Sequence, residues 1–263
     1  MLPTAQTITV LSQKGGTGKT TTVRTLADTF RRVGLEVLVA DLDPQGNLSD
    51  YYDVPADASP TVAEVLTGSA KAGDAIHDGV LPANLGLAEA ELVLAGKMGR
   101  ELTLKRALRD LRRRYDLILI DCPPALGLLT VNSLVAADYA LISTEAEYFS
   151  LQGVEQALEV IELAKDSLHP DLEWIGVVLN IADMRLVHAR EAQTQLKERF
   201  GEKVFETVVR RSVRYAESAE RGVSILDYAP DLGSDYLALA GEVLERLGGF
   251  EEARERLGTL TPA

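Results

Sequence analysis

The sequence has few of the residues that build metal centres and covalent cross-links. Its 263 residues include one cysteine, Cys122, and three widely separated histidines, His77, His169 and His188. One thiol allows no internal disulfide, and a single copy of the chain can form neither a four-cysteine zinc site nor an iron–sulfur cluster. The histidines lack the spacing of a metal site, so we expect them to be surface or structural residues. The low cysteine count fits a reducing cytoplasm.

Long apolar runs and an excess of positive charge are also missing. No run approaches the roughly 18 residues of a transmembrane helix, and the first residues do not resemble a secretory signal. We therefore expect a soluble, cytoplasmic protein with no membrane partner. With 27 Lys and Arg against 40 Asp and Glu, the formal net charge is −13. This charge argues against a histone-like protein coated in positive charge, but it leaves room for a local basic patch.

Apolar segments alternate with helical patterns along the chain, which is typical of a parallel sheet covered by helices. The expected strands are nearly continuous runs of Val, Ile and Leu, as burial on both faces requires: residues 8–11, 37–42, 117–121, 139–144 and 174–181. The expected helices are residues 19–33, 101–114, 151–167, 189–199 and 235–247. We predict an α/β fold with a mostly parallel central sheet and helices on both of its faces.

Three further segments have recognisable local patterns. Thr61 and Glu64 form a capping-box pattern that predicts a short helix in the irregular connection of residues 53–100. In the expected helix 101–114, an apolar stripe leaves Arg109 and the run 112–114 outside, which predicts a solvated basic face. Residues 249–263 are mixed in charge, and we expect a frayed tail after a domain of residues 1–248.

The most informative segment is residues 12–22, with the sequence SQKGGTGKTTT, between an expected strand and an expected helix. Gly15, Gly16 and Gly18 allow a tight turn with inward N–H groups, Lys19 can reach β- and γ-phosphates, and Thr20 can ligate magnesium. A Gly-rich hairpin would not need the Lys-Thr pair after an apolar strand. The segment predicts a site for a nucleoside triphosphate with Mg²⁺.

A second lysine makes this loop unusual. The ordinary pattern GxxxxGK[ST] has a glycine where this chain has Gln13, and Lys14 follows it at the front of the loop. Two lysines in one phosphate-binding loop indicate two different roles.

Two aspartates follow expected strands beside this loop. Asp43 lies in the segment DLDPQGN and Asp121 in the segment LILIDCPP. Aspartates at such positions bind magnesium or orient water in a P-loop fold, although a strand-end aspartate can also cap a helix or form a turn. Asp43 is the better candidate to orient or deprotonate an attacking water, and Asp121 suits the surroundings of the metal. With Thr20, they are the candidate magnesium residues.

These motifs together resemble the ParA group of deviant Walker A ATPases, including its small chromosomal members called Soj. The resemblance rests on KGGTGKTTT, DLDPQGN and LILIDCPP, and it continues through residues 126–134, 147–153 and 209–218. It implies a three-layer P-loop NTPase fold and weak, magnesium-dependent hydrolysis of ATP to ADP and phosphate. It also implies a role in partitioning chromosomes or plasmids.

The resemblance assigns roles within the nucleotide site. In the family, the lysine matching Lys14 reaches across an ATP-sandwich homodimer to the partner's phosphates, so Lys14, Lys19 and Asp43 become the implied catalytic residues. Gly15 would lie where the two loops approach most closely, and Asn180 matches a position that reads adenine. The implied ATP contacts are Lys14, Gly15, Gly16, Thr17, Gly18, Lys19, Thr20, Thr21 and Asn180.

The resemblance also implies binding to DNA without sequence preference. Arg185 and Arg214 match arginines that the family uses on its dimer surface, and Arg211 is a plausible neighbour. Phosphate contacts carry no base code, which suits a nucleoid-associated protein. The implied protein partner is a ParB-like centromere-binding protein that stimulates hydrolysis. Where the family usually has Pro-Arg-Asn this chain has residues 210–212, Arg-Arg-Ser, which leaves the base contact open and predicts that Arg210 enlarges the DNA patch.

Functions other than partitioning would require different sequence features. A MinD-like regulator would end in a basic amphipathic helix that binds lipid, and residues 250–257 are too acidic for that. A redox protein like the nitrogenase iron protein needs two cysteines per subunit. Because the P-loop lies so near residue 1, we do not expect a preceding helix-turn-helix domain. A relative that positions another cargo or regulates cell division stays open, because an adaptor chooses the cargo.

Overall fold

The chain folds around one seven-stranded, all-parallel β-sheet in the computed structural model, which describes residues 4–147 and 149–260. The strands are β1 (Gln6–Leu11), β2 (Val37–Asp41), β3 (Val80–Leu81), β4 (Leu117–Asp121), β5 (Tyr139–Glu145), β6 (Glu173–Ala182) and β7 (Val204–Arg210). Their order across the sheet is β3-β2-β4-β1-β5-β6-β7, and every neighbouring pair is parallel. This confirms the predicted P-loop α/β fold.

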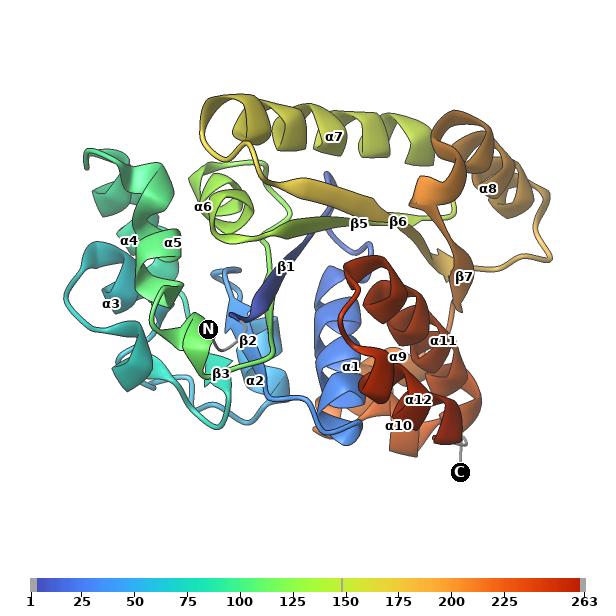
Figure 1. The fold of residues 1–263 in the computed structure, drawn as a ribbon, viewed down its shortest axis with the longest axis horizontal. Coiled ribbons are helices and arrows are strands. Elements are labelled where there is room, and N and C mark those ends of the chain that lie inside the picture. The colour runs from blue at the N-terminus through green and yellow to red at the C-terminus, as the bar shows by residue number, and fades with distance from the viewer. Residues whose placement is uncertain (1–3, 148, 261–263) are drawn as a thin grey trace.

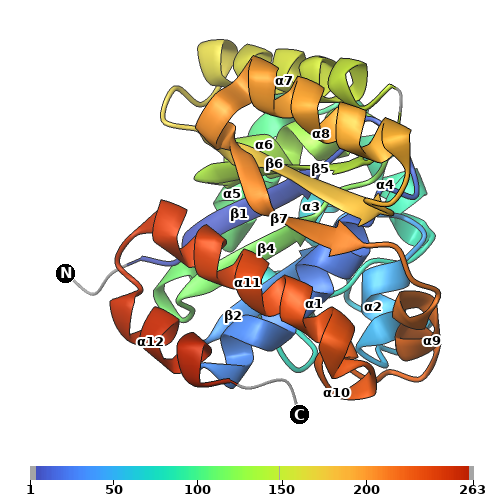
Figure 2. The same ribbon diagram turned by 90° about the vertical axis from the view of Figure 1, so that its right-hand side faces the viewer.

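Helices cover both faces of this sheet and form two separate cores (Figures 1 and 2). One face carries α3 (Val62–Thr67), α4 (Gly86–Ala95), α5 (Thr103–Leu108), α6 (Leu128–Ala136), α7 (Ser150–Ser167) and α8 (Val187–Phe200). The other carries α1 (Lys19–Arg32), α2 (Asn47–Tyr51), α9 (Arg214–Glu220), α10 (Ile225–Tyr228), α11 (Pro230–Leu247) and α12 (Glu251–Thr259). Strand β4 serves both cores, because Ile118 and Ile120 face one and Leu117 and Leu119 face the other.

The strand order places a crevice at the end of β1. This strand lies between β4 and β5. After β1 the chain crosses through α1 to β2 on one side of β1, whereas after β4 it crosses through α6 to β5 on the other side. Ligands of open parallel sheets bind beyond the carboxyl ends of the strands where the order reverses in this way. The loop after β1 is residues 12–18, the predicted phosphate loop, so the fold puts it at the expected binding edge.

One expected helix is broken. Instead of a helix over residues 101–114, the chain forms 3-10 turns at Arg100–Leu102 and Leu111–Arg113 on either side of α5. The second turn brings Arg112 to Ala5 O at 2.8 Å and to Asp138 Oδ2 at 2.6 Å. The interpretation of residues 112–114 as a solvated face is therefore wrong for Arg112, which joins the chain before β1 to the start of β5. The predicted capping box of Thr61 and Glu64 is confirmed at the start of α3.

The tail is ordered as a helix rather than frayed over Glu251–Thr259. In α12, Ala253 and Leu257 are buried in the core shared with α1 and α11, and Arg256 donates a hydrogen bond of 3.0 Å to Val33 O. Residues 261–263 lie outside the described part of the chain. The division into a domain of residues 1–248 and a tail stays a prediction. Among the described residues, no helix is both long and apolar enough to cross a membrane.

Candidate nucleotide-binding site

The loop after β1 is held in a fixed shape by its own side chains. Gly16 and Gly18 have φ values of +80° and +82°, which glycine adopts without strain. The Thr17 hydroxyl donates to Ser12 Oγ at 2.9 Å, while Thr17 O accepts from Ser143 Oγ at 2.7 Å. The N-terminus of α1 follows directly, so its free N–H groups and its positive dipole end face the loop.

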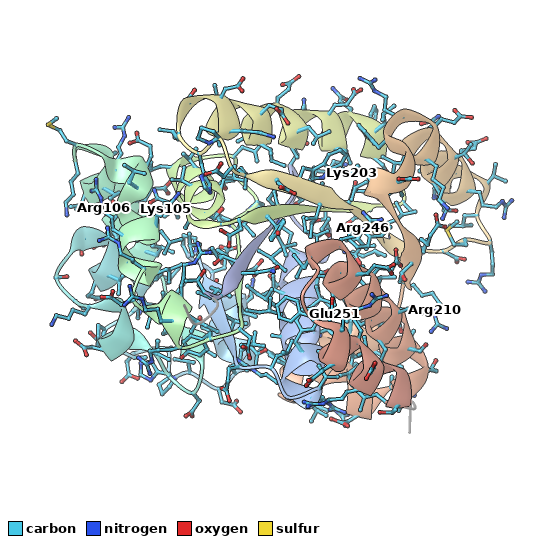
Figure 3. The ribbon with its side chains drawn as sticks, in the orientation of Figure 1. Lys105, Arg106, Lys203, Arg210, Arg246 and Glu251 are labelled. Carbon is cyan, nitrogen blue, oxygen red and sulfur yellow. The ribbon has the colours of Figure 1, made fainter. Side chains whose placement is uncertain are left out.

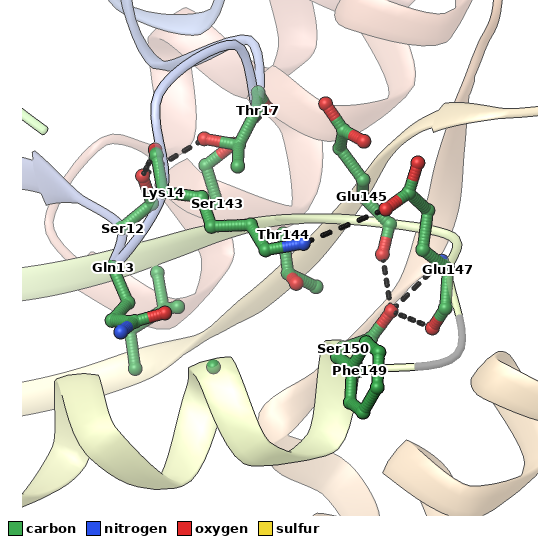
Figure 4. A pocket seen from close by; sticks show the side chains of 12 residues that line it. Ser12, Gln13, Lys14, Thr17, Ser143, Thr144, Glu145, Glu147, Phe149 and Ser150 are labelled. Carbon is green, nitrogen blue, oxygen red and sulfur yellow. Dashed lines mark hydrogen bonds and ion pairs between the residues drawn. The ribbon is translucent and has the colours of Figure 1, made fainter.

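Lys19 lies inside the site and Lys14 lies outside it. The Lys19 ammonium is buried and donates to Ser12 Oγ at 2.9 Å and to Lys14 O at 3.2 Å. Burial lowers the pKa of Lys19, and Asp121 opposes that shift. Lys14 is half-exposed and lies 3.6 Å from Glu147 Oε2, in a small separate pocket that Glu145 and Ser150 also line (Figure 4).

A cavity of about 510 Å³ lies along this loop and is large enough for a nucleotide; it is the main cavity of this site. Most of the predicted nucleotide residues line it: Gly15, Gly16, Gly18, Lys19, Thr20, Thr21, Asp43 and Asn180. Lys14 and Thr17 instead line the small pocket. Asp121 is fully buried behind the cavity and reaches it through Thr20.

The buried carboxylate Asp121 has one oxygen in use and one without a partner. Thr20 Oγ1 donates to Asp121 Oδ2 at 2.6 Å, whereas Oδ1 has no hydrogen-bond partner. Burial and the neighbouring Asp41 raise the pKa of Asp121 to about 8. A buried, unsatisfied carboxylate oxygen costs free energy unless a cation or proton joins it. Oxygen ligands at a phosphate loop suit Mg²⁺, so the residues present fit the predicted magnesium site.

Asp41 is a site residue that the sequence interpretation missed. It stands opposite Asp121 in the β2–β4 register, and burial raises its pKa to about 6. Its Oδ2 accepts from the N–H and the hydroxyl of Ser49, and its Oδ1 accepts from the N–H of Asp43. Asp41 thus fixes the turn that carries Asp43. The signal was present in the segment DLDPQGN, which holds two aspartates at alternate positions.

Among the described residues, no group of three or more His, Cys, Asp and Glu side chains could hold a metal ion by itself. Mg²⁺ at a nucleotide site keeps several water ligands and is bound by one or two protein oxygens together with phosphates. Asp43 lies on the rim of the cavity, where its Oδ1 accepts from the N–H of Gln45 at 3.0 Å.

The cavity is also lined by Asn180, Ile181, Tyr215 and Tyr236, and Asn180 lies beside Gly18. Asn180 is 1% exposed and donates to Thr22 Oγ1 at 3.1 Å and to Ser143 Oγ at 2.6 Å. Its Oδ1 has no partner. Ile181 has a φ of +52°, which is strained for a β-branched residue and is found mainly where function requires it.

The predicted DNA-binding arginines lie on adjacent loops at the same edge of the sheet. Arg185 follows β6 and forms a bidentate pair with Asp183, while Arg214 opens α9 at 3.7 Å from Asp231. Arg211 follows β7, and its backbone N–H donates to Ala182 O, which joins the two loops. Arg211 also lines the main cavity.

Arg210 is ion-paired, as Arg185 and Arg214 are. Its guanidinium bonds Asp235 and the carbonyl of Asp231, and it lies against α11 in Figure 3. These contacts join the end of β7 to α11, and the enlargement of a DNA patch by Arg210 stays a prediction. One motif residue of the segment 147–153, Tyr148, lies outside the described residues.

Known proteins similar to this chain over nearly its whole length include chromosome-partitioning proteins. A family model described as an AAA domain matches residues 5–174. The chromosome-partitioning ATPase Soj of Thermus thermophilus is 40% identical over 245 residues, which cover 91% of this chain and 96% of the relative. The chromosome partitioning protein ParA of Myxococcus xanthus is 38% identical over 250 residues, covering 91% and 88%.

A solved structure of cobyrinic acid a,c-diamide synthase from Mycobacterium smegmatis, with bound ADP and magnesium, is also similar. It is 36% identical, with a TM-score of 0.75, and the match covers 82% of this chain and 93% of that one. Its ligands are those that the main cavity and the Thr20–Asp121 pair are suited to hold.

Proposed function

This chain belongs to the Soj/ParA family of chromosome-partitioning ATPases, and we propose that it is an ATP-dependent dimerisation switch. In this proposal it binds ATP with Mg²⁺, forms an ATP-sandwich homodimer, binds DNA without sequence preference and hydrolyses ATP slowly. A ParB-like centromere-binding protein stimulates that hydrolysis. The switch drives chromosome or plasmid partitioning from the nucleoid in the cytoplasm.

The observation that carries the proposal is the opposite placement of two lysines from one loop. Lys19 is 6% exposed and lies within reach of the cavity's phosphate end. Lys14 lies outside that cavity, and its side chain is 54% exposed. A second copy placed face to face would bring the negative charge of two bound nucleotides near Lys14. A cation supplied by the partner neutralises this charge, so ATP binding and dimerisation support each other.

Gly15 supports the same arrangement. A Cβ added there would lie 3.8 Å from Pro124 Cβ, an ordinary contact, and nothing else lies closer. The packing of this chain alone therefore does not require glycine at this position. A close approach by the loop of a second copy gives a reason for it.

The environment of Asn180 favours adenine over guanine. Both N–H groups of its amide donate to Thr22 and Ser143, which leaves Oδ1, an acceptor, as the amide atom without a partner. The 6-amino group of adenine is a donor, whereas guanine carries an acceptor there. A guanine would leave two acceptors facing each other in a buried position.

The hydrolytic step needs a water aligned with the γ-phosphate and a means of stabilising the developing charge. Asp43 is the side chain of the rim that can orient or accept a proton from this water, and its turn is held by Asp41 and Gln45. Lys19, which also lines the cavity, donates to the phosphate oxygens. Thr20 and Asp121 would hold Mg²⁺, which would neutralise phosphate charge when bound. This division of roles is part of the proposal.

DNA binding is proposed through Arg185, Arg211 and Arg214. The loops that carry them follow β6 and β7, at the sheet edge where the nucleotide cavity opens. One copy offers few cations beside its acidic surface. A dimer doubles the group and makes DNA binding depend on ATP.

A MinD-like membrane regulator is the alternative from a different class. Its terminal helix would need a free apolar face, yet the apolar residues of α12, Ala253 and Leu257, are buried against the core. The first turn of α12 presents Glu251 and Glu252. These observations favour DNA over lipid. Pelleting with anionic liposomes separates the two, since a MinD-like protein would pellet with ATP.

The test of the proposal is a gel shift with random-sequence DNA in the presence of no nucleotide, ADP, or a slowly hydrolysed ATP analogue, each with Mg²⁺. We expect a shift only with the analogue. Affinity should fall with salt, with a log–log slope of about −0.9 for each neutralised phosphate. Equal binding in all three nucleotide states would refute the switch, and salt-insensitive binding would refute the phosphate contacts.

A further inference from the structure

A buried arginine lies between the two ends of the nucleotide cavity without lining it. Arg24 is in the middle of α1 and is 3% exposed, which is rare for arginine. Its Nη2 donates to Tyr215 O at 2.7 Å and to Ser218 Oγ at 3.2 Å, both on α9. Its guanidinium also stacks over the ring of Tyr51, the last residue of α2, at 4.6 Å from the ring centroid.

Tyr51 is itself held in place from α1. Its hydroxyl donates to Asp28 Oδ2 at 2.7 Å, and the neighbouring Tyr52 hydroxyl donates to Asp28 Oδ1 at 3.2 Å. Asp28 lies one helical turn after Arg24; its carboxylate accepts from Tyr51, while the Arg24 guanidinium donates to α9. A desolvated cation–π contact and charge-assisted hydrogen bonds are directional, so they fix the relative position of three helices.

These helices carry opposite walls of the cavity. Helix α2 begins directly after the turn of Asp43, and this turn lines the end where the γ-phosphate of ATP is expected. Helix α9 begins at Arg214 and supplies Tyr215, Ala216 and Ala219 to the other end. Arg24 contacts both α2 and α9.

We propose that Arg24 and Tyr51 are positioning residues that couple the Asp43 turn to α9, so that loss of the γ-phosphate is felt at Arg214. The measurement of DNA affinity rests on the proposed function, whereas the measurement at α9 does not need DNA binding. A rigid link of this kind transmits a shift because packed contacts have discrete arrangements rather than stretching. Coupling between two sites of a protein typically amounts to 5–150-fold in affinity, and we expect about tenfold here.

The experiment measures amide hydrogen exchange of α9 with Mg²⁺ and either ADP or a slowly hydrolysed ATP analogue. The two nucleotides share base and ribose, so a difference at α9 reports the γ-phosphate. The variants are Tyr51→Leu, which removes the ring under Arg24, and Arg24→Gln, which removes the charge and the stack. Tyr51→Phe is the matched control, because it keeps the ring and loses only the hydroxyl. Light scattering records dimer formation, and the gel shift gives the ratio of DNA affinities in the two states.

We expect the parent and Tyr51→Phe to show an α9 difference between the two nucleotides. Tyr51→Leu and Arg24→Gln should still bind nucleotide and dimerise but lose this difference, and their DNA affinity ratio should fall about tenfold. A parental difference that persists in Tyr51→Leu, or no difference in the parent, overturns the coupling. So does melting of both variants below the assay temperature, which would make the link purely structural. A parent that shows the exchange pattern but binds no DNA refutes the proposed function and leaves the coupling supported.

Discussion

Replacing Asp121 by asparagine should change how the stability of the metal-free protein depends on pH. Asp121 is fully buried, and its pKa is raised from 3.8 to about 8 by desolvation and by Asp41. When folding raises the pKa of an acid, the free energy of unfolding is highest at a pH low enough to protonate the acid in both the folded and the unfolded state. This stabilisation is complete below pH 3.8 and is lost as the pH rises through 8. Asparagine keeps the shape of the side chain and carries no ionisable group.

The size of the effect follows from the shift. Each pKa unit corresponds to about 1.4 kcal/mol, so between pH 5 and pH 7 the parent should lose about 3 kcal/mol relative to Asp121→Asn. For a domain of this size, that is about 6–12 °C in melting temperature. Asp41 also has a raised pKa and interacts with Asp121, so the difference between the two proteins reports the loss of Asp121 together with its coupling to Asp41.

The assay is urea unfolding at pH 5, 6, 7 and 8 with a chelator. It can be followed by the fluorescence of Trp174, the only tryptophan, which packs edge-on against Phe200. Glu255→Gln, which removes an exposed carboxylate from α12, is the control and should follow the parent at every pH. Saturating Mg²⁺ and ATP should reduce the difference in unfolding free energy between the parent and Asp121→Asn, because the ionised form of Asp121 attracts the cation. If the free energies of unfolding of the parent and Asp121→Asn changed equally with pH, the assignment of a buried carboxylate that holds a proton would be refuted.

Three further substitutions test separate parts of the site. Asp43→Ala should retain ATP binding and dimers while hydrolysis falls by at least tenfold, since its carboxylate is placed to handle the attacking water; phosphate release at the parental rate would contradict this role. Arg214→Glu should weaken binding to random-sequence DNA and reduce the salt slope by about 1 or more while sparing nucleotide affinity, as a gel shift at several salt concentrations can measure. Gly15→Val should fold and bind nucleotide as a monomer, because nothing in its own chain lies within 3.8 Å of the new Cβ; a stable ATP-dependent dimer would show that the loops do not approach there.

Local sequence predicted the central strands and the phosphate loop because each is defined by neighbouring residues. Strand β4 is a run of apolar residues buried on both faces, and it was predicted with its observed ends, residues 117–121. Strand β7 was missed. It is an edge strand with partly exposed residues, and Glu242 of α11 covers the free N–H groups of Glu206 and Thr207. Such a contact between distant segments leaves no local pattern.

The same distinction holds within the site. Lys19, Thr20 and Asp121 were predicted from motifs, and the structure brings them together. The importance of Asp41 depends on its register opposite Asp121, which only strand pairing sets. The engagement of Arg210 with Asp235, 25 residues away, likewise could not be read from a run of arginines.

The central claim is that a second copy of the chain completes the ATP site through Lys14. It is tested most directly by the molar mass in solution of the parent and of Lys14→Gln, measured by light scattering with Mg²⁺ and either ADP or a slowly hydrolysed ATP analogue. We expect the parent to double its mass only with the analogue. Lys14→Gln should bind the nucleotide and stay monomeric. A Lys14→Gln dimer of parental stability would contradict the account.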